Sequence, residues 1–195
     1  MKCLALLAVL AMLVVAPGVV LAQSENHVEF GPFADYMRYD RSNSTTTNFV
    51  GVGGRIGFYF NPYASVEAEM SYDFARNNSF TTANGLSSNF TTTSLRPLTG
   101  LFGPKLQFGK GNFDVFGTGK VGFMNFSVVN PNSVGFATSV GNITTGATHF
   151  ALYPGVGLEG FAGAFGFRAE VGDEIYFLNG GQNNLRVTFG PQFRF

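Results

Sequence analysis

The chain has 195 residues, of which 45% are hydrophobic and only 12% are charged, with 23 Phe and 26 Gly. Twelve Lys and Arg balance twelve Asp and Glu, which excludes a basic surface for nucleic acid, so we expect no nucleic-acid partner. Cys3 is the single cysteine, which excludes a disulfide within the chain.

The first residues predict a secretory signal peptide over residues 1–22. Lys2 supplies a positive start, Cys3–Ala16 form an apolar run, and Pro17–Gly18 break a helix before a cleavage point with small residues. A transmembrane anchor is the alternative, because the apolar run approaches the roughly 20 residues that a spanning helix needs. The helix break and the lack of a basic flank favour the signal peptide, which leaves residues 23–195 as one β-barrel domain.

Beyond this segment, apolar and polar side chains alternate with period two, which predicts strands. Most of the predicted strands reach the roughly 9–11 residues with which a tilted strand crosses a bilayer. In chain order the eight predicted strands are Val28–Tyr39, Phe49–Phe60, Ala64–Phe74, Leu95–Phe108, Phe113–Asn125, His149–Phe161, Phe165–Phe177 and Leu185–Phe195.

The links between these strands alternate in length. Three are tight turns, at residues 61–63, 109–112 and 162–164, and the links between them are longer and polar. This alternation is typical of an up-and-down membrane barrel with short periplasmic turns and long external loops. We expect the Asn-, Ser- and Thr-rich links, above all Ala75–Ser94 and Phe126–Thr148, to lack fixed structure of their own and to offer the best contacts for external partners.

The composition of the two strand faces decides which face points outward. A soluble barrel or sandwich would turn the apolar face inward and expose Gly, Ser, Thr and isolated charges, a poor surface for solubility. Small and polar residues suit the narrow interior of an eight-stranded barrel. We therefore predict an all-β, eight-stranded antiparallel up-and-down transmembrane β-barrel whose apolar face meets lipid.

The face predicted to point inward carries six basic and six acidic residues. Buried charge is tolerable only when it is paired and hydrogen-bonded, so this set predicts a salt-bridged plug. Independent charges in a wider, water-filled lumen are the alternative. The predicted interior charges are Arg55, Glu67, Glu69, Asp73, Lys105, Asp114, Lys120, Glu159, Arg168, Glu170, Arg186 and Arg194.

Three prolines fit the predicted barrel badly. Pro104, Pro154 and Pro191 each remove a hydrogen-bond donor within a predicted strand, and a closed barrel has no free edge to hold them. We expect them to mark bulges or the rim.

Three segments carry a resemblance to a known family: Phe189–Phe195, Leu101–Phe108 and Phe167–Val171. With them the chain resembles the small eight-stranded outer-membrane barrels, the group of the OmpA transmembrane domain and OmpX. The resemblance implies a bacterial outer-membrane location and an assembly signal at Phe193 and Phe195, read by the barrel assembly machinery, although Pro191 departs from the apolar residue usual there. It also implies contact with outer-membrane lipid and lipopolysaccharide, and we expect a monomer.

Chemical motifs are weak. Gly155–Gly160 has the spacing of a dinucleotide fingerprint, but a turn and another strand follow it in place of the required helix. His149 lacks a nucleophile partner in sequence and suits a polar rim, and Glu67 with Glu69 suit interior ion pairs better than acid/base catalysis. We expect no catalytic, cofactor or metal site.

The sequence thus predicts a structural, surface-exposed envelope protein that is not an enzyme. A small passive pore is the first alternative. A lipid-modifying outer-membrane enzyme and a soluble periplasmic binder of the lipocalin type are more distant ones.

Overall fold

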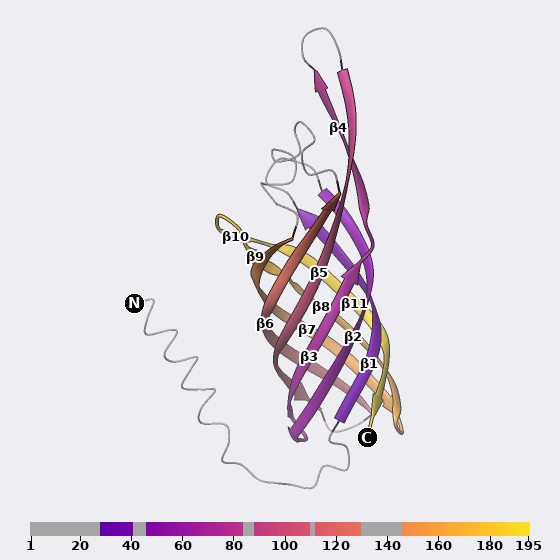
Figure 1. Ribbon diagram of the computed structural model, residues 1–195. Helices are drawn as coiled ribbons and strands as arrows, with labels where there is room; N and C mark the ends of the chain where they lie inside the picture. Colours follow the sequence, from indigo (N-terminus) through magenta and orange to yellow (C-terminus); the bar gives the residue numbers. More distant parts are fainter. Residues whose placement is uncertain (1–27, 41–45, 84–87, 110–111, 130–145) are drawn as a thin grey trace, which may run out of the picture.

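A computed structural model describes residues 28–40, 46–83, 88–109, 112–129 and 146–195. Across these ranges every regular element is a β-strand (Figure 1). No helix in the described ranges is long and apolar enough to cross a membrane. The predicted signal peptide, residues 1–22, lies outside the described residues, as does most of the link at 126–148.

Eight long strands close into one antiparallel barrel, which confirms the predicted fold class. Each strand pairs with its neighbours in the barrel order β1-β2-β3-β5-β6-β7-β8-β11, and β11 returns to β1. The elements are β1 (Val28–Asp40), β2 (Thr46–Asn61), β3 (Ala64–Asp73), β4 (Arg76–Ala83), β5 (Ser88–Phe108), β6 (Phe113–Val129), β7 (Ala147–Ala162), β8 (Phe165–Asp173), β9 (Ile175–Phe177), β10 (Gly181–Gln182) and β11 (Asn184–Arg194).

The prediction that Ala75–Ser94 lacks fixed structure is wrong for most of that link. β4 pairs with the first part of β5, from Arg76↔Leu95 to Ala83↔Ser88, and this hairpin rises beyond the barrel at the end away from the C-terminus (Figure 1). Thr and Phe are strong strand formers, and once the two arms pair they satisfy each other's backbone groups.

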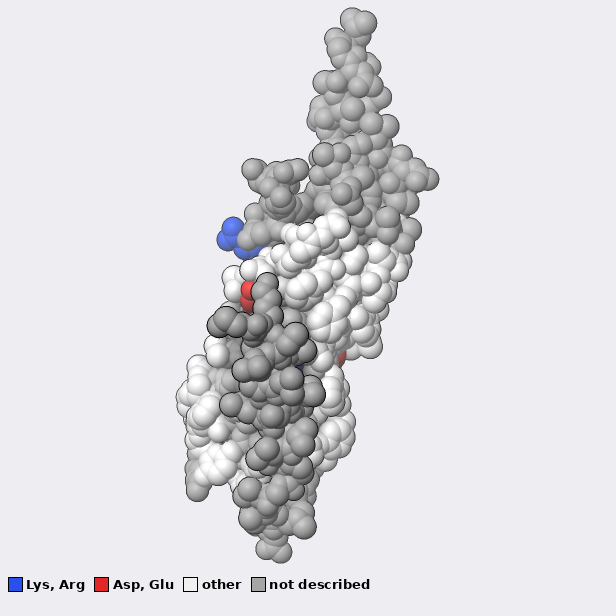
Figure 2. Space-filling view, turned by 90° about the vertical axis from the view of Figure 1, so that its left-hand side faces the viewer, with Lys and Arg blue, Asp and Glu red and all other residues white. Residues whose placement is uncertain are grey.

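The apolar face points outward along the barrel wall. Val52 and Phe58 are each 51% exposed, whereas their neighbours Gly51 and Gly57 are buried. On the side drawn in Figure 2, the described surface of the barrel wall is almost free of charged side chains. A wall of exposed Phe, Val, Leu and Ile without charge is suited to hydrocarbon and not to water.

The three prolines lie at interruptions of the strand pairing, without a shift of register. The β5–β6 pairing skips Gly103 and Pro104, and β7 has no paired partner on its β8–β9 side at Tyr153 and Pro154. The β1–β11 pairing skips residues 31–33 and 190–192, which include Pro191. A proline lacks the backbone donor that pairing requires, so the ladder opens there, and the expectation of bulges is wrong at these positions.

Candidate functional site in the barrel interior

The structure places eleven of the twelve predicted interior charges in the barrel, each at most 6% exposed. Arg194 is the exception, and its placement inside was wrong. Its Nε donates to the carbonyl of Gly163, and its guanidinium lies 4.3 Å from the ring centroid of Phe161. Arg194 lies on the same strand face as the buried Arg186, Thr188 and Gln192, but it is the last residue of β11, so its side chain reaches the rim and not the middle of the lumen.

Lys120 and Arg168 hold the middle of the interior. Lys120 Nζ lies 2.6 Å from Glu69, 3.1 Å from Glu170 and 3.3 Å from Glu67. Arg168 donates bidentate hydrogen bonds to Glu67, and its Nη2 also lies 2.5 Å from Glu170. Strands β3, β6 and β8 are therefore linked by side chains as well as by their backbones.

Lys105 organises the end of the interior that is nearer the short turns. Its Nζ lies 2.9 Å from Glu29 and 3.0 Å from Glu159. Tyr59 donates its hydroxyl to Glu29 at 2.6 Å, and Gln192 donates its amide to the same carboxylate at 2.9 Å. Glu29 is thus satisfied by three side chains from three other strands.

Arg186 and Arg55 share acids with Lys120 and extend the network to further partners. Arg186 lies 2.8 Å from Asp35, 2.8 Å from Glu69 and 3.3 Å from Glu174. Thr99 donates its hydroxyl to Glu174 at 2.7 Å. Arg55 lies 3.1 Å from Glu170 and donates to the hydroxyl of Thr188 at 2.9 Å.

The predicted balance of six against six is wrong in detail. Among the described residues, nine carboxylates and five cations are buried, because Arg194 leaves the interior while Glu29, Asp35 and Glu174 join it. The missed residues lie in β1 and between β8 and β9, where aromatic side chains fall on both faces and obscure the alternation. The excess of carboxylates means that each of the five cations is shared between two or more acids.

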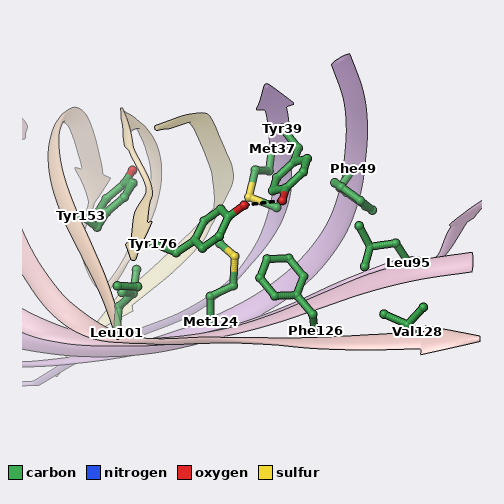
Figure 3. Close-up of a cluster of buried hydrophobic side chains, with 11 residues drawn as sticks. Met37, Tyr39, Phe49, Leu95, Leu101, Met124, Phe126, Val128, Tyr153 and Tyr176 are labelled. Atoms are coloured by element: carbon green, nitrogen blue, oxygen red, sulfur yellow. Dashed lines mark hydrogen bonds between the residues drawn. The ribbon is translucent and has the colours of Figure 1, made fainter. Parts of the chain in front are cut away.

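A cluster of apolar side chains lies inside the barrel (Figure 3). It lies towards the end with the β4–β5 hairpin, because Tyr39, Leu95 and Val128 are near that end of their strands. The hydroxyls of Tyr39 and Tyr176 are hydrogen-bonded, and their rings stack with centroids 5.8 Å apart. Phe126 meets both rings edge-on, at 6.1 Å and 5.3 Å. This interior cluster comprises Met37, Tyr39, Phe49, Leu95, Leu101, Met124, Phe126, Val128, Ala151, Tyr153 and Tyr176.

Sequence reasoning missed the interior cluster because it assigned apolar side chains to the lipid face. The available signal was the loss of alternation towards the hairpin end of the strands, where apolar residues occupy consecutive positions, as at Tyr36–Met37 and Phe123–Met124. His149, which the sequence assigned to a polar rim, is half-buried beside this cluster, with its ring 5.9 Å from those of Phe126 and Tyr176.

The remaining sequence motifs lie within strands, in ion pairs or near the rim of the barrel. Gly155–Gly160 lies within β7, in extended conformation, and Glu67 and Glu69 are both in ion pairs. Phe193 lies near the rim with its ring 5.4 Å from that of Phe30, and Phe195 is 63% exposed. In the part of the chain that is described, no group of three or more His, Cys, Asp or Glu could hold a metal ion.

Comparison with known proteins agrees with this architecture. The family model of the outer membrane protein beta-barrel domain matches residues 4–193. Neisserial surface protein A is similar in structure, with a TM-score of 0.62 at 9% identity over 86% of this chain and 97% of that one. Ail, the attachment invasion locus protein of Yersinia pestis, has a TM-score of 0.53 at 14% identity over 87% of this chain and 97% of that one.

Ail has also been solved in complex with the heparin analogue sucrose octasulfate, and that structure matches with a TM-score of 0.53 at 13% identity over 87% of this chain and 97% of that one. At such identities these likenesses concern the fold alone. A search of curated protein sequences finds no match.

Proposed function

The chain belongs to the outer membrane protein β-barrel family, and from this premise we propose that it is a structural, surface-exposed protein of the bacterial outer membrane whose barrel is closed to ions and solutes. A closed interior leaves the membrane sealed, so the activity of such a protein resides in its outer rim and loops. In this role the chain is not an enzyme.

The filled interior carries the proposal. An eight-stranded barrel is only wide enough for its own side chains. Here two barriers lie in series: the ionic network around Lys120 and the interior cluster around Phe126, with side chains at most 1% exposed at both centres. A passive pore would need a continuous aqueous path past both.

The outer end supports a role in surface contact. The β4–β5 hairpin extends past the barrel, and the strand ends that border residues 41–45 and 130–145 lie at the same end (Figure 1). In barrels of this type the short turns are periplasmic, so this end is extracellular. Two proteins of similar structure are named a surface protein and an attachment invasion locus protein. By analogy with them, we propose that this chain is also exposed on the cell surface.

Conductance tests the closed barrel. Purified protein refolded into planar lipid bilayers is expected to give no steady channels, whereas a larger porin in the same bilayers conducts and serves as the positive control. Steady, ohmic conductance from the refolded protein would establish the passive pore instead.

Labelling tests surface exposure. Apart from Cys3 in the predicted signal peptide, the chain has no cysteine, so a single introduced thiol reports its own position. Ala83→Cys, at the hairpin tip, is expected to react with a membrane-impermeant maleimide on intact cells, and Ala164→Cys, in a short turn, is expected to react only after lysis. The reverse pattern would contradict the proposed orientation.

A further inference from the structure

The lipid-facing wall is hollowed at strand β6. Along its outward face, Val115 and Val121 are 46% and 47% exposed, but the two outward positions between them are Gly117 and Gly119. A Cβ added at either glycine would meet nothing within 4 Å. The β6 backbone itself is therefore the floor of a hollow in the wall.

Neighbouring strands form the sides of this hollow. Gly117 pairs with Leu106 of β5 on one side and with Val156 of β7 on the other, and these side chains are 52% and 58% exposed. The hollow measures about 550 Å³, and none of the described residues that line it is charged. A second hollow shares Val156 and Val171 with it and reaches Val187 of β11.

Two prolines make this hollow, which forms a groove over β5–β8, rigid. Pro154 pairs with Gly119, and Pro104 faces Gly119 across the interruption of the β5–β6 pairing. Proline has a fixed φ and its ring adds no rotatable bond, so both sides of the floor are preformed. A preformed groove binds a flexible chain at a smaller entropic cost than a groove that must first be ordered.

From this geometry we propose that the groove over β5–β8 binds one acyl chain of a phospholipid as a fixed ligand. An uncharged groove in the lipid-facing wall matches a hydrocarbon chain and offers no charge to a headgroup. Left empty, its glycine floor would lose the dispersion contacts that the exposed side chains beside it make with lipid.

The position of the groove selects phospholipid as the source of the chain. Phe108 lines one end of the groove and is the last residue of β5 before a short turn, at the periplasmic end in barrels of this type. The periplasmic leaflet of an outer membrane consists of phospholipid. A second copy of this chain is a poorer occupant, because a two-fold contact centred here would set hollow against hollow.

Native mass spectrometry of the detergent-solubilised protein with added phosphatidylethanolamine tests the proposal. The wild type is expected to carry one bound phospholipid. Gly117→Leu combined with Gly119→Leu fills the floor and is expected to weaken this adduct about tenfold, the factor for about two displaced methylene groups. The matched control, Val121→Leu, lies on the same strand and face outside the groove and is expected to keep the adduct. Equal adducts in all three proteins would overturn the proposal, as would a wild-type dimer that the double variant converts to a monomer.

A second measurement leaves the glycines in place, in case the double variant fails to fold. The chain has no Trp, so one introduced indole is the only one to report. Leu106→Trp lies at the groove wall, and Phe58→Trp replaces a side chain of nearly the same exposure, 51% against 52%, on β2 outside the groove. In detergent with a small excess of phosphatidylethanolamine brominated on its acyl chains, the fluorescence of the Leu106→Trp variant is expected to be quenched about twofold or more relative to that of the Phe58→Trp variant. Equal quenching would overturn the proposal.

Discussion

Lys120 Nζ lies 2.6 Å from Glu69 Oε2, and this contact joins β6 to β3, two strands that share no backbone pairing. The same ammonium reaches Glu170 on β8 at 3.1 Å. One side chain thus ties together three strands around the barrel. The charges of the interior stabilise the closed shape as cross-links and not only as compensation for one another.

Removing the charge of Lys120 should therefore be costly. Lys120→Met keeps most of the side-chain volume but leaves Glu67, Glu69 and Glu170 short of a cation, and loss of one partner of a buried pair costs about 3–5 kcal/mol. Urea unfolding of the protein in lipid vesicles, followed by circular dichroism, measures the change. Arg194→Met is the control, since this rim arginine should cost about 0.5 kcal/mol or less. Equal losses in the two variants would refute the cross-link account.

The interior cluster should behave as a soluble protein's core does. Phe126→Ala leaves a cavity among buried rings and is expected to lower the unfolding free energy by about 3–5 kcal/mol. Phe113→Ala, at a position 65% exposed on the lipid face, is expected to cost clearly less, because lipid fills the space. The same unfolding assay compares the two, and an equal or larger loss at Phe113 would contradict the prediction.

Substitution by alanine is expected to lower the stability of the barrel at one glycine and to leave it unchanged at another on the adjoining strand. A Cβ at Gly103 would lie 2.2 Å from the Gly119 carbonyl oxygen, whereas one at Gly119 meets nothing within 4 Å. Gly103→Ala is expected to destabilise the barrel by about 1–3 kcal/mol through overpacking against backbone. Gly119→Ala is expected to be tolerated, with both variants compared by thermal unfolding of the gel-shifted folded form.

The two terminal phenylalanines are expected to promote insertion. The backbone of Phe195 pairs with Val28 in both directions, at 3.0 Å and 2.9 Å, which closes the first and last strands at the rim. Phe193→Ala with Phe195→Ala is expected to reduce the membrane-inserted fraction several-fold while the backbone pairing stays possible. Phe189→Ala, on the same face of β11, is the control, and unimpaired insertion of the double variant would count against the assembly signal.

The β4–β5 hairpin should be dispensable for folding. Its backbone pairing links β4 only to β5, and Arg76 adds a hydrogen bond to the Asn48 carbonyl. Replacing residues 77–93 by a short Gly-Ser turn is expected to leave the heat-dependent gel shift of the folded barrel unchanged. Loss of that shift would mean that the hairpin is part of the barrel's stability.

Much of the barrel wall could be predicted from the sequence, because the alternation of apolar and polar residues depends only on neighbouring positions in the chain. In β2 the alternation from Val50 to Phe60 assigns each side chain to a face without knowledge of any other strand, and Val52 and Phe58 lie outward as expected. The short turns were equally visible. The hairpin was missed because the pairing of Arg76–Ala83 with Ser88–Leu95 depends on two arms of similar polarity, neither of which alternates.

By itself, the sequence determined the strand count, the outward face and most of the charges that lie inside, because period-two alternation and turn composition are properties of neighbouring residues. Only the tertiary structure decided which carboxylates each cation contacts and that Arg194 stays at the rim. It also decided that apolar side chains fill the lumen towards the end with the β4–β5 hairpin. Closure of the barrel brings together residues as distant along the chain as Asp35 and Arg186, and the partner of a buried charge is set by that register.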